Sequence, residues 1–228
     1  MHTEVTTLLA GASSARGLVV IIDAFRAFTT ACHGAAASPG SYVLVGDSST
    51  AARLAAYRPR PLLVGKAELG ASLGYDVPNS PTLLRAHLLR NRTIIHRTGA
   101  GARGILQATA ADEVIAASFV NAAAIARYIR LQAPTRVTLV AMGHEGTSPT
   151  LEDALCAKAI QADLLGQPFD LGPWLQPLRE GSGRYFFEGA QEEYPRADFD
   201  ECTALDRFSF VLRAEVHGDY AELIRVDC

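Results

Sequence analysis

The chain has 228 residues, of which 49% are hydrophobic, enough to bury a substantial core in one large domain. The formal net charge is −3, and no basic stripe with interleaved aromatic residues is present, so the composition argues against a nucleic-acid partner. The N-terminal segment lacks the pattern of a signal peptide, and the apolar runs are too short to span a bilayer. We therefore expect a cytoplasmic protein with no membrane partner.

Short apolar runs alternate with helical stretches, which is typical of α/β proteins with a largely parallel sheet. The predicted strands are Leu18–Ile22, Tyr42–Val45, Leu62–Val64, Thr93–His96, Val114–Ala117 and Val137–Ala141. The predicted helices are Thr50–Tyr57, Thr82–Leu89, Ala122–Gln132 and Leu151–Leu165. Their predicted starts are Asp47 or Ser48, then Ser80 before Pro81, then Asn121, and finally Thr150 with Asp153 as a capping box.

The pattern changes after residue 165, where glycine and proline become frequent. Beyond that stretch, Phe208–Val216 and Tyr220–Val226 are predicted to form a C-terminal β-hairpin. We expect a single three-layer α/β/α domain with a mostly parallel or mixed sheet. Its core would span residues 18–165, and residues 166–228 would extend it.

The most informative stretch is Leu18–Thr30, LVVIIDAFRAFTT, in which a buried strand ends abruptly in polar residues. Ligands of open α/β sheets bind at the carboxyl ends of strands. There Asp23, Arg26 and the hydroxyls of Thr29 and Thr30 could hold a metal, a phosphate or both. The alternative is that Asp23 caps the next helix and pairs with Arg26.

The third predicted strand, Leu62–Val64, leads into a long loop, and long loops of this kind are often functional. The loop can present Lys66, Glu68, Asp76 and Asn79. The alternative is that Asp76 and Asn79 only shape the turn before Ser80.

The stretch Gly99–Gly104 matches the G-x-G-x-x-G pattern of dinucleotide-binding proteins. No acidic residue follows the next strand, where a ribose would be recognised, so we expect neither NAD nor ATP to bind. The turn could still bind a phosphate through backbone N–H groups, with Arg103 supplying the charge. The alternative is a tight turn that carries a surface arginine.

Polar residues also follow the last two predicted strands. Ser118 and Asn121 follow the first of these, and Asn121 could simply cap a helix. Glu152 and Asp153 begin a helix after the second. Adjacent helical residues point about 100° apart, so we expect one carboxylate to face a site while the other caps. Together, five strands would deliver polar loops to one sheet edge, an arrangement that suits Mg²⁺ and a phosphate.

The order of these motifs resembles the 2-phosphosulfolactate phosphatase family, Mg²⁺-dependent phosphatases of coenzyme M biosynthesis. The matching residues are Asp23, Phe25, Arg26 and Thr29–Thr30, Gly74, Asp76 and Asn79–Pro81, Gly101 and Arg103, Ser118, Phe119, Asn121 and Ala122, and Gly143, Gly146, Glu152, Asp153 and 155–157. The chain departs from the family pattern at Lys66, Pro78, Ala100 and Ala102, where the pattern has Glu, Gly, Asn and Thr.

The resemblance implies Mg²⁺-dependent hydrolysis of a phosphate monoester on a small acidic molecule. Asp23 with Glu152 or Asp153 would hold the metal, and Glu68 and Asp76 are further candidate ligands. Arg26 and Arg103 would neutralise the phosphoryl oxygens. The substrate would be positioned by Asn121, Thr29, Thr30, Asn79, Ser80 and Ser118.

Two other functions stay open from the sequence. One is a non-catalytic binding protein with a remodelled anion site, and the other is a nucleotide-dependent enzyme that uses Gly99–Gly104. The oligomeric state is open as well, with a homodimer as one expectation. The departures at Lys66, Ala100 and Ala102 predict a natural substrate other than phosphosulfolactate, or poor activity on it.

Overall fold

The computed structural model describes residues 1–66, 73–189 and 191–228. Its strands are β1 (His2–Thr7), β2 (Gly17–Ile22), β3 (Ser41–Val45), β4 (Pro61–Val64), β5 (Thr93–Arg97), β6 (Ala111–Ala117), β7 (Arg136–Ala141), β8 (Phe210–His217) and β9 (Tyr220–Asp227). Its α-helices are α1 (Leu8–Ser14), α2 (Ala27–Ala36), α3 (Ser48–Ala55), α4 (Pro81–Leu84), α5 (Ala100–Gln107), α6 (Ala122–Gln132), α7 (Leu151–Leu164), α8 (Leu175–Glu180), α9 (Tyr185–Glu188) and α10 (Ala197–Cys202). Two 3₁₀ turns, η1 (Phe119–Asn121) and η2 (Gly172–Trp174), precede α6 and α8.

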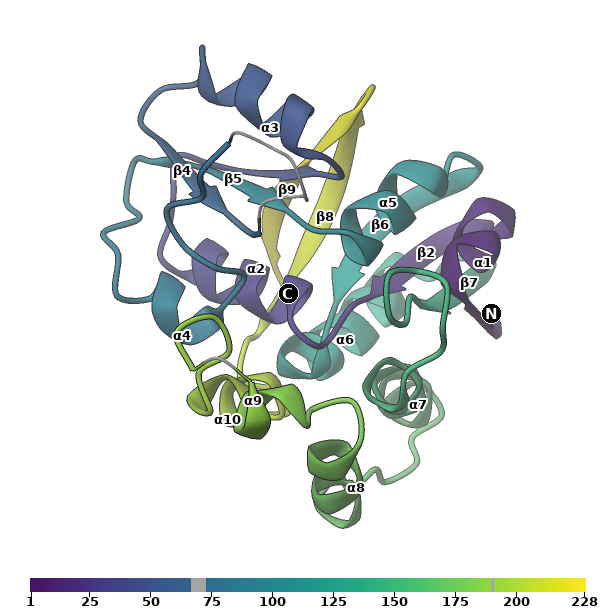
Figure 1. The fold of residues 1–228 in the computed structure, drawn as a ribbon. Coiled ribbons are helices and arrows are strands. Elements are labelled where there is room, and N and C mark those ends of the chain that lie inside the picture. Colours follow the sequence, from purple (N-terminus) through teal and green to yellow (C-terminus); the bar gives the residue numbers. More distant parts are fainter. Residues whose placement is uncertain (67–72, 190) are drawn as a thin grey trace.

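The strands form one mixed sheet in the order β1-β7-β2-β6-β8-β9-β3-β5-β4. Two groups of parallel strands, β1-β7-β2-β6 and β3-β5-β4, lie on either side of the C-terminal hairpin β8-β9, drawn in yellow in Figure 1. Three successive antiparallel pairings join the groups, so the strands of one group run opposite to those of the other. The expectation that five strands end at one sheet edge is therefore wrong, because the hairpin reverses the direction between the two groups.

Both faces of the sheet are covered, as the apolar strands predict. On β2, Val19 and Ile21 pack with α2 and α5 on one face, whereas Val20 and Ile22 pack with α6 and α7 on the other. Helix α3 covers the second face over β3 and β5. The expected three-layer α/β/α architecture with a mixed sheet is confirmed.

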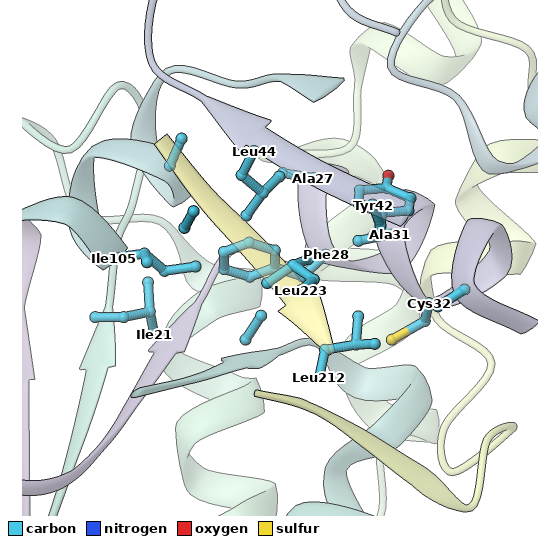
Figure 2. Packing of buried hydrophobic residues seen from close by; sticks show 14 of the residues in the cluster. Ile21, Ala27, Phe28, Ala31, Cys32, Tyr42, Leu44, Ile105, Leu212 and Leu223 are labelled. Atoms are coloured by element: carbon cyan, nitrogen blue, oxygen red, sulfur yellow. The ribbon is translucent and has the colours of Figure 1, made fainter. Parts of the chain in front are cut away.

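The core of the first face is centred on Phe28, a fully buried residue of α2. Figure 2 shows its ring among side chains from both parallel groups and from the hairpin. Ile21 of β2, Leu44 of β3, and Leu212 and Leu223 of the hairpin belong to the same cluster. Apolar burial therefore joins the two groups through the hairpin between them.

Several local predictions are confirmed, and others are corrected. The C-terminal hairpin is present, and the Asp47 and Ser80 side chains cap α3 and α4. Thr150 stands at the N-cap of α7 as expected, but the predicted capping box is wrong, because the Thr150 side chain makes no capping hydrogen bond. The helix after Ser80 ends at Leu84 instead of continuing to residue 89. Within the described residues, no helix is long and apolar enough to cross a bilayer.

Candidate active site

A cavity of about 1160 Å³ is lined by loops that follow β2, β3, β4, β5 and β7. Residues 174–228, here called the C-terminal segment, line it as well. Although the two strand groups run in opposite directions, loops from both groups meet here. Its charged lining residues are Asp23, Arg26, Lys66, Arg97, Arg103, His144, Glu145, Glu152, Asp153, Arg184, Glu188 and Glu193. The cavity thus combines carboxylates with guanidinium groups, as the sequence motifs predict for a phosphate site.

Asp23 follows β2, lines the cavity and is only 8% exposed. Its two carboxylate oxygens accept hydrogen bonds from Ala27 N at 3.3 Å and Gly101 N at 2.9 Å. Asp23 thus caps the start of α2 through the N–H group of its first residue, although the N-cap residue itself is Arg26, and it also binds the start of α5. Burial raises its pKa to about 6, against the lowering effect of these two hydrogen bonds.

Glu152 and Asp153 both line the cavity, so the expectation that only one of them faces the site is wrong. Asp153 accepts hydrogen bonds from Ala24 N at 2.8 Å and Gly143 N at 2.7 Å. It thereby fixes the loops after β2 and β7 relative to each other.

The three carboxylates influence one another electrostatically. Burial raises the pKa of Asp153 well above its usual range, and the charges of Glu152 and Asp23 raise it further. Burial also raises the pKa of Glu152, whose charged form the nearby Ser182 and Thr150 hydroxyls favour. Among the described side chains, no hydrogen bond of good geometry reaches Oε2 of Glu152, which is buried. Such an oxygen is suited to bind a cation.

These residues fit a divalent cation as an open site and not as a closed one. No group of three or more described His, Cys, Asp or Glu side chains has metal-binding geometry. Mg²⁺ usually takes one or two protein carboxylates, and the substrate phosphate and water complete its coordination. Glu152 could supply one of these carboxylates through its unpartnered Oε2. Asp23 and Asp153 each accept two backbone N–H hydrogen bonds, and Asp23 is the better candidate for the second because its bonds, at 3.3 and 2.9 Å, are longer than those of Asp153, at 2.8 and 2.7 Å.

Arg26 lines the cavity but is only 6% exposed. Its Nη1 donates to Asp198 Oδ2 at 2.8 Å and to the carbonyl oxygen of Glu193 at 2.8 Å. The guanidinium also stacks on Tyr194, with 4.4 Å between its carbon and the ring centroid. Arg26 therefore pairs with Asp198, and the alternative in which it pairs with Asp23 is wrong.

Further cationic side chains of the lining are less buried than Arg26. Arg103 is exposed and makes no ion pair with any described residue, so its charge is available to an anion. Lys66 pairs with Glu193 at 3.0 Å, and the carbonyl oxygen of Lys66 accepts from Arg97 Nη1 at 3.3 Å. The charge reversal at position 66 is thus balanced by a carboxylate from the C-terminal segment.

The glycines of Gly99–Gly104 serve close packing. A Cβ at Gly101 would lie 2.8 Å from the Phe28 ring, and one at Gly104 would lie 2.5 Å from Met142 Sδ. The N–H group of Gly101 already donates to Asp23. The motif therefore lets α5 approach the sheet and the carboxylate closely, which explains the pattern without a dinucleotide.

The other predicted site residues lie at varying distances from the cavity. Asn79 lines it, and its buried Oδ1 has no partner among the described residues. The lining of described residues does not include Thr29, Thr30, Asp76, Ser80, Ser118, Asn121 or Ala102. Three of these hydrogen-bond to the backbone: Thr29 donates to Ala24 O, Asp76 accepts from Leu63 N, and Asn121 accepts from Ser118 N. Glu68 lies outside the described residues.

Sequence reasoning missed the contribution of the C-terminal segment. The cavity lining includes Ser182, Tyr185, Glu193 and Tyr194. Asp198 accepts a hydrogen bond from the lining residue Arg26. They stand in a stretch without a recognisable motif. The sequence offered one indirect indication. If Arg26 is buried, its charge requires a carboxylate partner, which can come from a distant part of the chain.

Comparison with known proteins supports the resemblance seen in the motifs. Residues 5–173 match the family model described as 2-phosphosulpholactate phosphatase. A Cyanothece sp. protein named "Probable 2-phosphosulfolactate phosphatase" is 32% identical over 148 residues, 64% of this chain and 60% of that protein. A Thermosynechococcus vestitus protein of the same name is 30% identical over 150 residues, 65% of this chain and 61% of that protein.

A Bacillus subtilis protein, also named "Probable 2-phosphosulfolactate phosphatase", is 24% identical over 210 residues, or 91% of both chains. The matches to the two cyanobacterial proteins span only about three fifths of their length. The region matched by the family model includes Asp23, which follows β2, and Glu152 and Asp153, which lie in α7. On this match, the chain belongs to the 2-phosphosulpholactate phosphatase family.

Proposed function

We propose that this protein hydrolyses a phosphate monoester on a small acidic molecule and requires a divalent cation, Mg²⁺, to do so. The observation that supports this proposal is the composition of one cavity. Asp23, Glu152 and Asp153 line it close enough to interact electrostatically, and Arg26 and Arg103 supply positive charge to the same space. Carboxylates can hold a hard cation, and guanidinium groups can bind phosphoryl oxygens.

In this proposal, Asp23 and Glu152 hold the cation, which when bound polarises a phosphoryl oxygen as a Lewis acid. Asp153 does not need to bind it, because its two backbone hydrogen bonds keep the loops after β2 and β7 in place. The roles of Asn121, Ser118, Thr29, Thr30 and Ser80 would then be structural support of the neighbouring helices and not contact with the substrate.

The arginines differ in what they offer to the phosphate. Arg26 uses only Nη1 in its hydrogen bonds to described residues, which leaves Nη2 and Nε for a phosphoryl group. Arg103 is exposed and can meet the phosphate as it enters. Both would stabilise the negative charge of the equatorial oxygens during transfer.

Phosphate release from a panel of phosphoacids, with Mg²⁺ and with EDTA, tests this function. We expect turnover with Mg²⁺ that EDTA abolishes. Binding of a phosphoacid without turnover would favour the anion-binding alternative instead. Micromolar affinity for NAD or ATP by calorimetry would favour a nucleotide-dependent enzyme.

The panel should include phosphosulfolactate, because the cavity differs from the family pattern at two lining positions, Lys66 and Ala100. Position 102 is buried in the core and is not part of the lining, so Ala102 does not bear on the substrate directly. We expect poor turnover of phosphosulfolactate, improved by Ala100→Asn together with Lys66→Glu. Efficient turnover by the natural chain with no gain in the variant would contradict this expectation.

A further inference from the structure

The guanidinium of Arg26 is held almost entirely by residues that come after the end of the matched family region. Asp198 of α10 accepts its Nη1 at 2.8 Å, and the carbonyl oxygen of Glu193 accepts the same atom. Tyr194 covers one face of the guanidinium. These three residues lie in the C-terminal segment, whereas the family model ends at residue 173.

Asp198 is itself fixed and completely buried. Its Oδ1 accepts hydrogen bonds from Ser80 Oγ at 2.9 Å and from Thr82 N at 3.0 Å, at the start of α4. Its Oδ2 is left for Arg26. The carboxylate therefore links three segments that are distant in sequence, and each of its oxygens has a defined partner.

A buried ion pair of this kind is costly to form and is weak evidence for a purely stabilising role. What it supplies here is orientation, because the bond to Nη1 fixes the plane of the guanidinium. That plane leaves Nη2 and Nε without a hydrogen bond to any described residue, at the wall of the cavity. A fork with two adjacent free donors suits a phosphate, which accepts two parallel hydrogen bonds.

We propose that Asp198 is a positioning residue that aims Arg26 at the phosphoryl group, with Tyr194 holding the guanidinium plane from one side. The proposal rests on the proposed function for its catalytic consequence. Its binding consequence does not, because inorganic phosphate can be tested without turnover. On this view, Ser80 contributes to the site through Asp198 rather than by touching substrate.

The experiment is a double-mutant cycle of Arg26→Gln and Asp198→Asn, with the affinity for inorganic phosphate measured by calorimetry in the presence of Mg²⁺. Each single variant should bind phosphate about 10-fold more weakly, the scale of a lost charge-assisted hydrogen bond. The double variant should bind no more weakly than Arg26→Gln alone, because Asp198 acts only through Arg26. The same non-additivity is expected in kcat/KM on the best substrate of the phosphoacid panel.

The melting temperature, Tm, should change across the same variants in a different way from the phosphate affinity. Arg26→Gln leaves the buried Asp198 charge unpaired and should lower the Tm. Adding Asp198→Asn removes that charge, so the double variant should melt higher than Arg26→Gln while its phosphate affinity stays the same. A residue that only stabilised the fold would instead change affinity and stability together.

Glu201→Gln is the matched control. Glu201 lies on the same helix, forms ion pairs with Arg85 and Arg207, and is not part of the described cavity lining. It should lower the Tm and leave phosphate affinity unchanged. Additive losses of phosphate affinity in the cycle, or a wild-type protein that does not bind phosphate, would overturn the positioning role. Phosphate binding with the expected cycle but no turnover of any phosphoacid would overturn the proposed function alone.

Discussion

The matched family region, residues 5–173, and the C-terminal segment, residues 174–228, contribute to the cavity in different ways. The first region provides the three carboxylates and Arg103, all of which stand in recognisable motifs. The second provides the carboxylate, the carbonyl oxygen and the aromatic ring that hold Arg26. Motifs thus mark the groups that would meet metal and phosphate, whereas the groups that orient them carry no local signature.

The same contrast holds for the sheet. Strands of the first region form two parallel groups that no pairing joins directly, and the hairpin of the second region connects them. The segment that looks like an extension in the sequence is therefore central in the structure.

The largest expected effect concerns Asp23, in the first region. Asp23→Asn should lower Mg²⁺-dependent kcat/KM by at least about 1000-fold, because the variant keeps the shape and loses the charge that would bind the cation. Phosphate-release kinetics measure the loss, and circular dichroism should show a folded protein. Near-normal activity would remove Asp23 from the mechanism, and an unfolded variant would leave only its capping role.

The second prediction compares how much the hairpin and the parallel strands contribute to the free energy of unfolding. Leu212→Ala in β8 and Leu139→Ala in β7 remove side chains that are both fully buried. We expect each to lower the free energy of unfolding by about 2–5 kcal/mol, the usual cost of such a cavity. Urea denaturation measures both. A cost below about 1 kcal/mol for Leu212→Ala alone would show the hairpin to be peripheral.

The third prediction concerns pH and the acidic side of the cavity. Burial raises the pKa of Asp23 to about 6 from its ordinary value of 3.8. Without a cation, the folded wild-type protein therefore loses stability relative to Asp23→Asn as the pH rises from about 4 through 6. The difference should reach about 2–3 kcal/mol by pH 7, from a shift of about two pKa units.

Thermal unfolding in EDTA across this range measures the difference. The wild type must be compared with Asp23→Asn because two histidines change the stability of both proteins with pH in the opposite direction. Burial lowers the pKa of His33 to about 4 and that of His96 to about 3. They destabilise both proteins equally as the pH falls. Added Mg²⁺ should stabilise the wild type at pH 7 and not the variant. A difference that does not change with pH would contradict the raised pKa.

The smallest effects separate the two arginines. Arg26→Lys should cost about 1–3 kcal/mol in transition-state stabilisation, because lysine keeps the charge but loses the fork that Asp198 orients. Arg103→Lys should cost less, since Arg103 is exposed and no described residue orients it. The ratio of kcat/KM values for the two variants measures this. Equal losses would mean that orientation by the C-terminal segment is unimportant.

Local signals explain what the sequence predicted well. The buried run 18–22 could only be a strand covered on both faces, and Asp47 and Ser80 are favourable caps with their helices directly after them. By contrast, β1 was missed because HTEVTT has no apolar run, and it pairs only with β7 at the sheet edge. The position of the hairpin was not predictable, because pairing with β6 and β3 depends on contacts about 100 to 180 residues apart.

The candidate site divides in the same way. Asp23, Glu152 and Arg103 were predicted from motifs and lie on the cavity wall. Asp198 was not, because an aspartate within ADFDEC resembles the solvated face of a surface helix. Its burial follows from the packing of α10 against α4, which no nearby residue reveals.

The place of β8 and β9 in the sheet has a consequence for how the protein is made. A nascent chain leaving the ribosome exposes both parallel groups long before the strands that must lie between them. Until residues 210–227 emerge, the inner edges of β6 and β3 have no partner strand, and such edges invite pairing with other chains. Arg26 likewise lacks its ion-pair partner until Asp198 has been synthesised. Synthesis of residues 193–227 therefore first supplies the partners of Arg26 and then closes the sheet, both at a late stage.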